Sequence, residues 1–376
     1  MHYDHGELLA LDATVQELIR PLFDFLDREH GATEICINRP GEVWVEVGAT
    51  WKRHQAPDLT LQRCLSLATA IATYTEQEIS PQRPIMSAVL PGGERVQVVI
   101  PPAVEQETVS ISVRIPSASI KTLDEYDREG AFGRFVWPES PHYLARSGEL
   151  KEVDRQLYEH LCHNRLGRFI ELAVRSRKNI AVVGDTGSGK TTLMKSICQA
   201  IPRTERLVTI EDVRELFLPL HPNRVHLLYS KGGQGVAQVT PADLIAANMR
   251  MKPDRVLLAE LRGGEAFDFL KLLTTGHSGS VTSFHAESCA LAYERFVFMA
   301  KEHPNASVYD SDALKRLISL TIDVIMHVVA RNVPAAGGEP PRKERYVAEV
   351  HFDPIGKLVA QFGERKGHSA ALSDAF

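Results

Sequence analysis

The sequence is poor in cysteine, and the cysteines that it has are scattered. Five occur among 376 residues, at Cys36, Cys64, Cys162, Cys198 and Cys289. Their number is odd and no two form a C-x-x-C pair, so the sequence indicates neither a disulfide framework nor a structural zinc site. Unpaired, dispersed cysteines are typical of proteins in a reducing compartment.

Long apolar runs and a large net charge are also missing. No apolar stretch approaches the ~18 residues that a membrane-spanning helix needs, and the opening MHYDHGELLA is too acidic and polar for a secretory signal. Lys and Arg number 43 against 48 Asp and Glu, a net charge of −5, so tight nucleic-acid binding would require a local basic groove. We therefore expect a cytoplasmic protein.

The first 115 residues mix helical and strand patterns. Apolar spacing predicts a helix over Thr14–Asp27, interrupted at Pro21, and another over Leu59–Ala72. Alternating residues predict short strands at Glu34–Asn38, Glu42–Val47, Met86–Leu90, Arg95–Ile100 and Val109–Ile115. This combination favours a small α+β domain over residues 1–115.

The rest of the chain predicts a linker followed by a larger α/β domain. Residues 116–150 are rich in proline and serine and have no sustained period apart from a short helix near Leu123–Glu129, which is typical of an interdomain linker. Residues 151–376 alternate helices and strands, as in a mostly parallel sheet with helices on its faces, and the tail after residue 363 is expected to fray. Strands are predicted at Asn179–Val183, Leu207–Glu211, Arg255–Ala259 and Ser280–Phe284, with a final pair at Val324–Ala330 and Tyr346–Phe352.

A phosphate-binding motif stands between an apolar strand and a helix. The segment that fits G-x-x-x-x-G-K-[ST], with one further threonine, is Gly184, Asp185, Thr186, Gly187, Ser188, Gly189, Lys190, Thr191 and Thr192. Glycines let the backbone N–H groups point at phosphate oxygens, and the following helix adds its positive N-terminus. In this motif Lys190 reaches the β- and γ-phosphates and Thr191 binds Mg²⁺. The sequence therefore predicts an ATP and Mg²⁺ site.

Polar residues follow several other predicted strands, and they should meet at the same sheet edge as the motif. Glu211 and Asp212 end one strand, Glu260 ends another, and His285 follows a third. Acids in such positions hold Mg²⁺ or orient the attacking water. Alternatively, Glu211 or Asp212 caps the following turn, His285 is structural, and Arg262 pairs with a neighbouring acid.

Three segments after the motif resemble those of a known family. TIEDVREL, MKPDRVLLAELRGGEAFDFL and TTGHSGSVTSFHA, in that order, resemble the aspartate box, Walker B segment and histidine box of the secretion-superfamily ATPases. TEICINRPGEVWVE and PGGERVQVVIPP resemble that family's N-terminal domain, so the resemblance covers nearly the whole chain. The stretch ELRGGEA with TTGHSGS, and the linker piece TLDEYDREGAF, are most similar to the traffic ATPase of type IV secretion systems.

The resemblance implies a RecA-like C-terminal domain, a hexameric ring and nucleotide bound between the two domains. By matching motif, Glu260 polarises water, Glu211 supports Mg²⁺ or water, and both join Thr191 as candidates for the metal site. His285 matches the family's characteristic histidine.

Two arginines of the N-terminal domain, Arg95 and Arg114, match family arginines that reach the nucleotide. Strand parity agrees with this role, because both lie on the strand face opposite the valines. A solvated strand face is the alternative.

We therefore expect a hexameric, Mg²⁺-dependent ATPase that does conformational work for type IV secretion, in substrate export or pilus biogenesis. It would be cytoplasmic and peripheral at the inner membrane, with other secretion ATPases and inner-membrane components as partners. Two alternatives remain: a pilus-retraction or DNA-translocating motor of the same superfamily, and a non-catalytic nucleotide-gated switch.

Overall fold

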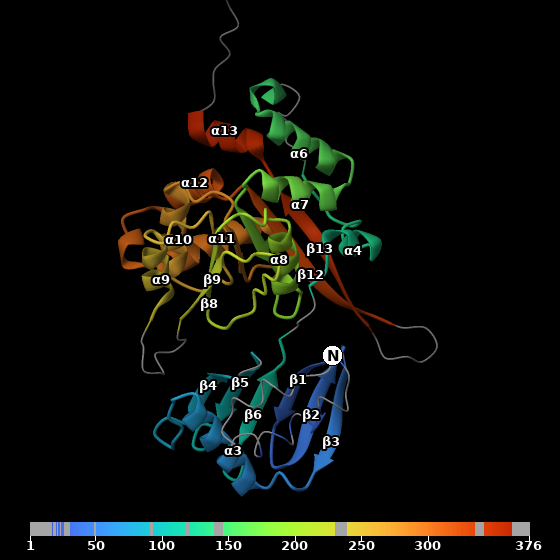
Figure 1. Ribbon diagram of the computed structural model, residues 1–376, viewed down its shortest axis with the longest axis vertical. Helices are drawn as coiled ribbons and strands as arrows, with labels where there is room; N and C mark the ends of the chain where they lie inside the picture. The colour runs from blue at the N-terminus through green and yellow to red at the C-terminus, as the bar shows by residue number, and fades with distance from the viewer. Residues whose placement is uncertain are drawn as a thin grey trace, which may run out of the picture.

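The protein contains two sheets that are built from separate parts of the chain, as the computed structural model shows (Figure 1). A six-stranded sheet comes from the N-terminal part, and in Figure 1 this blue and teal sheet lies below a seven-stranded C-terminal sheet. The residues that the structure describes are Glu17, Arg20, Leu22, Asp24, Phe25 and the ranges 31–48, 50–90, 93–116, 120–138, 146–229, 239–334 and 342–362.

The N-terminal sheet is antiparallel, with strand order β3-β2-β1-β6-β5-β4. Alternation forms its two faces: Val96 and Val98 of β5 are buried, while Arg95 and Gln97 lie on the opposite face. Helix α3 contributes its apolar side to the same core as the buried strand residues. The elements are β1 (Ala32–Ile37), β2 (Gly41–Val47), β3 (Thr50–Ala56), α3 (Leu61–Tyr74), β4 (Ile85–Val89), β5 (Arg95–Val99) and β6 (Ser110–Arg114).

The C-terminal sheet has the order β13-β12-β7-β11-β10-β8-β9, and all its pairs are parallel except β12 with β13. The predicted mixed α/β fold is thus confirmed. The strands are β7 (Ile180–Val183), β8 (Leu207–Glu211), β9 (Arg224–Leu228), β10 (Arg255–Leu258), β11 (Val281–Phe284), β12 (Val324–Val333) and β13 (Arg342–His351). The helices are α6 (Glu152–Cys162), α7 (Leu166–Arg175), α8 (Lys190–Gln199), α9 (Pro241–Asn248), α10 (Glu265–Thr274), α11 (Cys289–Lys301), α12 (Ser311–Thr321) and α13 (Pro354–Phe362).

Each face of this sheet has its own apolar core. Along β7, Ile180 and Val182 join the core that contains buried residues of α6, α7 and α8. Ala181 and Val183 join the core that contains buried residues of α10, α11 and α12. Because the sheet is covered on both sides, its central strands are buried at every position rather than at alternate ones.

The two strands that the sequence did not predict, β3 and β9, both lie at sheet edges. β3 pairs only with β2, and most of its residues, TWKRHQA, are exposed. β9 pairs only with β8, and none of its residues is fully buried. An edge strand without a strongly buried face leaves little hydrophobic period to recognise.

Part of the predicted linker packs against the C-terminal core. In α4 (Leu123–Arg128), Tyr126 stacks on Phe132 with 5.2 Å between ring centroids, and both belong to the core shared with α7 and α8. Further along, the N–H of Val136 donates to the carbonyl of Ala348 in β13 at 2.8 Å. Residues 120–138 are therefore attached to the larger sheet, while the N–H of Ile115 still donates to the carbonyl of Thr33 in β1 at 3.0 Å.

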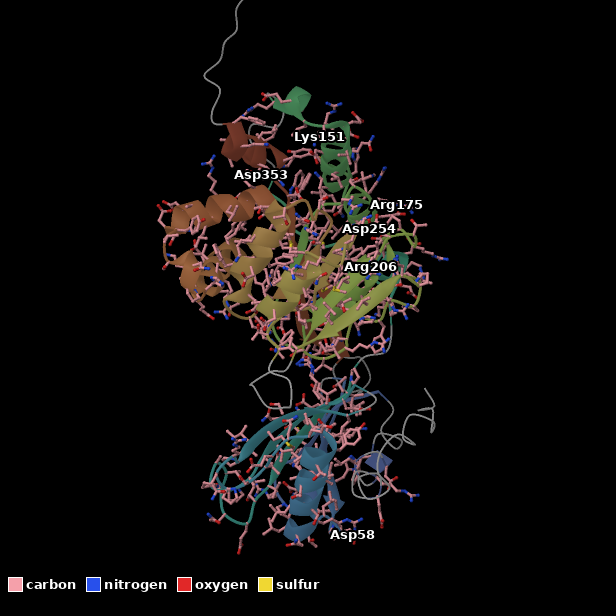
Figure 2. The ribbon with its side chains drawn as sticks, turned by 60° about the vertical axis from the view of Figure 1, so that its left-hand side comes forward. Asp58, Lys151, Arg175, Arg206, Asp254 and Asp353 are labelled. Atoms are coloured by element: carbon pink, nitrogen blue, oxygen red, sulfur yellow. The ribbon has the colours of Figure 1, made fainter. Side chains whose placement is uncertain are left out.

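Some predictions fall largely outside the described residues. Of the helix predicted over Thr14–Asp27, the described residues are helical, and Leu22 and Phe25 are buried. The tail from 363 onward and residues 139–145 lie outside them. Within the described ranges, none of the helices is both long and apolar enough to cross a membrane. Figure 2 shows how elongated the molecule is, with Asp58 at one end and Asp353 and Lys151 toward the other.

Candidate active site

The loop between β7 and α8 has a backbone that only glycine tolerates at several positions. Gly184, Gly187 and Gly189 have φ angles of 150°, 74° and 101°, in the region that favours glycine. A Cβ on Gly184 would lie 2.2 Å from the carbonyl oxygen of Val328 in β12. The loop therefore keeps its tight path because these residues have no side chain.

The ammonium of Lys190 lies inside this loop. Its Nζ donates to the carbonyl oxygens of Gly184 at 2.8 Å and Asp185 at 2.9 Å. Burial lowers the pKa of Lys190 to about 8, because desolvation penalises the charged form. The buried hydroxyl of Ser188 has no hydrogen-bond partner. A cation held by replaceable carbonyls and an unsatisfied hydroxyl both fit the oxygens of a bound phosphate chain.

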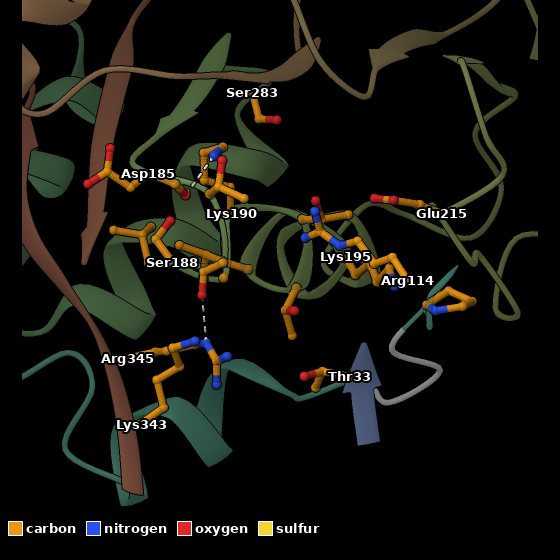
Figure 3. A pocket seen from close by; sticks show the side chains of 18 of the residues that line it. Thr33, Arg114, Asp185, Ser188, Lys190, Lys195, Glu215, Ser283, Lys343 and Arg345 are labelled. Atoms are coloured by element: carbon orange, nitrogen blue, oxygen red, sulfur yellow. Dashed lines mark hydrogen bonds between the residues drawn. The ribbon is translucent and has the colours of Figure 1, made fainter. Parts of the chain in front are cut away.

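A cavity of about 1060 Å³ opens beside the loop, at the upper end of the range for small-molecule sites. Three separate parts of the chain line it, as Figure 3 shows: the loop with Lys190, the N-terminal sheet with Thr33 and Arg114, and β13 with Lys343 and Arg345. Other lining residues of the phosphate loop and helix are Asp185, Thr186, Gly187, Ser188, Gly189, Thr191 and Thr192. The site thus lies between the two sheets.

Glu260, two residues after the end of β10, and His285, directly after β11, meet in this cavity. Glu260 Oε1 lies 3.0 Å from His285 Nε2, and His285 Nδ1 lies 3.3 Å from Lys190 Nζ. Burial, and then the charge of Lys190, lowers the pKa of His285 below its ordinary value, so the ring favours the neutral form. These three side chains gather where a terminal phosphate would lie against the loop.

The two N-terminal arginines come to the same cavity from paired strands. Arg95 of β5 and Arg114 of β6 are direct cross-strand partners, so their side chains share a face. Arg95 Nη2 donates to Asp212 Oδ1 at 2.9 Å and lies 2.8 Å from Glu215 Oε1. These ion pairs join the N-terminal sheet to the loop after β8 within one chain.

Glu211 does not share this environment. Its side chain is fully buried and does not line the cavity. Oε2 accepts the backbone N–H groups of Glu215 and Leu216, both at 2.8 Å, and Oε1 accepts the hydroxyl of Thr209 at 2.6 Å. This arrangement matches the capping alternative rather than the expected role at Mg²⁺ or water, because both oxygens accept hydrogen bonds from the protein itself.

Arg262 does pair with neighbouring acids, as one alternative stated. Its Nε donates to Glu260 Oε2 at 2.8 Å and its Nη1 to Asp212 Oδ2 at 2.7 Å. Asp212 also caps its own turn by accepting the N–H of Val213 at 3.0 Å. The acid proposed to act on water is therefore held by an arginine as well as by a histidine.

Two cations of β13 were missed in the sequence. Arg345 Nε donates to the carbonyl oxygen of Gly187 at 3.2 Å, and Lys343 Nζ lies 3.4 Å from Glu46 Oε1 of the N-terminal sheet. Both lie in the first half of β13, before Tyr346, where the strand predicted from the sequence began. Nothing in the sequence indicated that β13 reaches the phosphate loop.

The protein supplies only part of a Mg²⁺ coordination shell in this cavity. Among the residues that the structure describes, no group of three His, Cys, Asp or Glu side chains is placed to hold a metal ion. Thr191 lines the cavity at the start of α8. This suits a metal that is bound mainly by phosphate oxygens and water with one hydroxyl from the protein.

Comparisons with known proteins agree on one family. Residues 152–365 match the family described as "Type II/IV secretion system protein". The chain is 42% identical over 357 residues to the type IV secretion system protein VirB11 of Brucella suis, which covers 94% of each chain. It is 42% identical over 320 residues to the type IV secretion system protein PtlH of Bordetella pertussis, which covers 85% of this chain and 91% of the relative. The ATPase DotB of Legionella pneumophila shares the fold, with 16% identity, a TM-score of 0.56 and coverage of 93% of this chain and 83% of that one.

Proposed function

This chain belongs to the type II/IV secretion system protein family, and we propose that it is an ATPase that powers type IV secretion. The observation that supports this most directly is the position of Glu260 and His285 opposite Lys190 in one cavity. A cation inside a phosphate loop facing a carboxylate is the arrangement that phosphoryl transfer to water requires.

In the proposed reaction, ATP binds with its phosphates along the loop and Lys190 exchanges its two carbonyl partners for phosphate oxygens. Glu260 polarises the attacking water, and neutral His285 contacts the terminal phosphate. Mg²⁺, held through Thr191, supplies charge neutralisation of the phosphates when it is bound. Arg95 and Arg114 offer donors to the charge that develops on the γ-phosphate.

The assembly and its stroke are part of the same proposal. The C-terminal sheet with its helices forms a RecA-like domain over residues 151–376, and six copies close into a ring. Residues 1–115 move as a unit against it. Since residues 120–138 pack on the larger sheet, they stay with it, and the movement is not spread over the whole of 116–150. The ring works at the inner membrane with other secretion components.

The decisive experiment replaces Glu260 by Gln. The amide keeps the shape of the side chain but cannot polarise water, so ATP should still bind while turnover falls by about a hundredfold or more. Steady-state hydrolysis and equilibrium binding of ATP measure the two properties separately. Near-normal turnover would remove Glu260 from the reaction, and an absence of turnover in the unmodified protein would favour a nucleotide-gated switch.

A further inference from the structure

Four charged side chains form a continuous line from the N-terminal sheet to the proposed catalytic acid. Arg95 binds Asp212, Asp212 binds Arg262, and Arg262 binds Glu260. The two ends of this line are residues with proposed roles in hydrolysis. The two middle residues, Asp212 and Arg262, have no role in that reaction, so their function needs its own account.

Arg262 contacts two acids, Glu260 and Asp212, and can shift between them. Its backbone is fixed, because Glu265 Oε1 accepts the N–H groups of Arg262 at 2.6 Å and Gly263 at 3.0 Å. Its guanidinium, in contrast, contacts two acids. Nε and Nη2 donate to Glu260 Oε2, while only Nη1 donates to Asp212. Because the backbone is fixed and the side chain contacts both acids, the guanidinium can shift from Glu260 toward Asp212 without a movement of the main chain.

The two carboxylate oxygens of Asp212 likewise have different arginine partners. Oδ2 accepts from Arg262, and Oδ1 accepts from Arg95. The Asp212 side chain is only 7% exposed, so water cannot replace a lost cation fully. If Arg95 leaves, the strongest replacement is a bidentate pair with Arg262, whose planar fork matches both carboxylate oxygens.

We propose that Asp212 and Arg262 are positioning residues that couple Arg95 to Glu260. When Arg95 moves to the nucleotide, Asp212 takes Arg262 in a bidentate pair and draws it away from Glu260. Glu260 Oε2 then becomes free for water. The N-terminal sheet therefore closes over ATP at the same time as the carboxylate of Glu260 becomes exposed to water. This inference rests on the proposed role of Glu260.

Both proposed catalytic groups, Arg95 and Glu260, are engaged by charged side chains of the protein itself. Arg95 has two acidic partners, Asp212 and Glu215, while Glu260 has Arg262 on one oxygen and His285 on the other. A free carboxylate beside a phosphate loop would repel the nucleotide's phosphates. Pairing Glu260 with Arg262 until Arg95 has moved reduces that repulsion during binding.

The test is a suppressor experiment. Asp212→Asn leaves no anion to attract Arg262, so Arg262 stays on Glu260; kcat should fall about tenfold, with KM for ATP changing less than about threefold. Adding Arg262→Gln removes the group that covers Glu260. The double variant should therefore turn over at least about fivefold faster than Asp212→Asn alone. Recovery by a second substitution is not expected if Asp212 only supports the fold or binds metal.

Controls keep the outcomes apart. Arg168→Gln breaks a surface pair with Glu171 (3.0 Å) outside the cavity and should leave kcat unchanged. Melting temperatures report folding, and Asp212→Ser serves as a second charge-removing variant if Asp212→Asn is unstable. Slow turnover in Glu260→Gln with no recovery in the double variant overturns the coupling alone. Normal turnover in Glu260→Gln overturns both the coupling and the proposed role of Glu260.

Discussion

The two walls of the cavity differ in how they are held in place. The wall with the phosphate loop continues a buried strand, and its geometry depends on main-chain positions such as Gly184 against Val328. The wall with Arg95 and Arg114 belongs to another sheet, and described contacts across the gap include ion pairs such as Arg95 with Asp212 and Lys343 with Glu46. One wall is fixed by packing, and the other is placed by charges.

This difference indicates separate roles for the two walls, one in binding the nucleotide and the other in responding to it. A wall fixed by packing keeps its donors aimed at phosphate whether or not nucleotide is bound, which is the preorganisation that catalysis needs. A wall placed by ion pairs can move where another cation takes over the acid that is left behind, as Arg262 can for the buried Asp212. The phosphate loop therefore suits capture of nucleotide, and the N-terminal sheet suits a response to it.

The largest effect should come from the fixed wall. Lys190→Ala removes the only side-chain ammonium that lies within the phosphate loop among the described residues, so we expect no detectable hydrolysis. The fold should persist, because the side chain adds no apolar packing. Lys271→Ala, which removes an exposed lysine paired with Asp268 on α10, is the matched control. Measurable turnover in Lys190→Ala would remove the loop from the reaction.

The next effect tests the movable wall. Replacing both Arg95 and Arg114 by alanine should lower turnover by about a thousandfold, the scale of an arginine contributed to phosphoryl transfer. Arg53→Ala, in the same sheet but away from the cavity, should keep normal turnover. Lysine should not restore either position, since a point charge cannot make the bidentate contact.

Mixing inactive subunits then shows which chain supplies the arginines. Lys190→Ala subunits are combined with subunits that lack both arginines. If the arginines act on a neighbour's site, mixed rings regain turnover, because one site can draw its lysine and its arginines from different chains. No recovery assigns them to their own chain, as the contact of Arg95 with Asp212 suggests. Full activity of the double-arginine variant alone would exclude both from the site.

The same contrast explains what the sequence could predict. The phosphate loop, Glu260 and His285 follow short buried strands, so the local pattern predicted them at one sheet edge. Arg345 and Lys343 were missed because their role depends on where β13 lies, which no local pattern encodes. Glu211 and Glu260 end neighbouring strands alike, yet only the tertiary structure shows that the turn after β8 closes over Glu211.

A smaller effect distinguishes these two acids. Glu211→Gln replaces an anionic acceptor of two backbone N–H groups by an amide, so we expect a loss of about 1–3 kcal/mol in the free energy of unfolding. Turnover per folded molecule should change less than about threefold, in contrast to Glu260→Gln. Denaturant unfolding and hydrolysis of the same samples measure both. A severe catalytic defect with normal stability would exchange the roles of the two acids.

The smallest expected effect is a pH dependence of the fixed wall. Burial lowers the pKa of Lys190 to about 8 from its ordinary 10.5, so the folded protein releases this proton more readily than the unfolded chain does. The unfolded chain therefore binds more protons between about pH 8 and 10.5, and for this group stability rises with pH across that window.

Nucleotide binding should show the opposite trend, because phosphate oxygens favour the charged ammonium and binding above pH 8 must take up a proton. Affinity should then fall about tenfold between pH 7 and pH 9, since a one-unit excess of pH over pKa leaves about one lysine in eleven protonated. His285 does not interfere, because its pKa is lowered below 6.5 and the ring is already neutral. Calorimetry in two buffers of different ionisation enthalpy measures the uptake directly. Binding at pH 9 without proton uptake would mean that Lys190 remains charged in its cage of carbonyls, and that the loop is prepared for phosphate even more completely than its burial indicates.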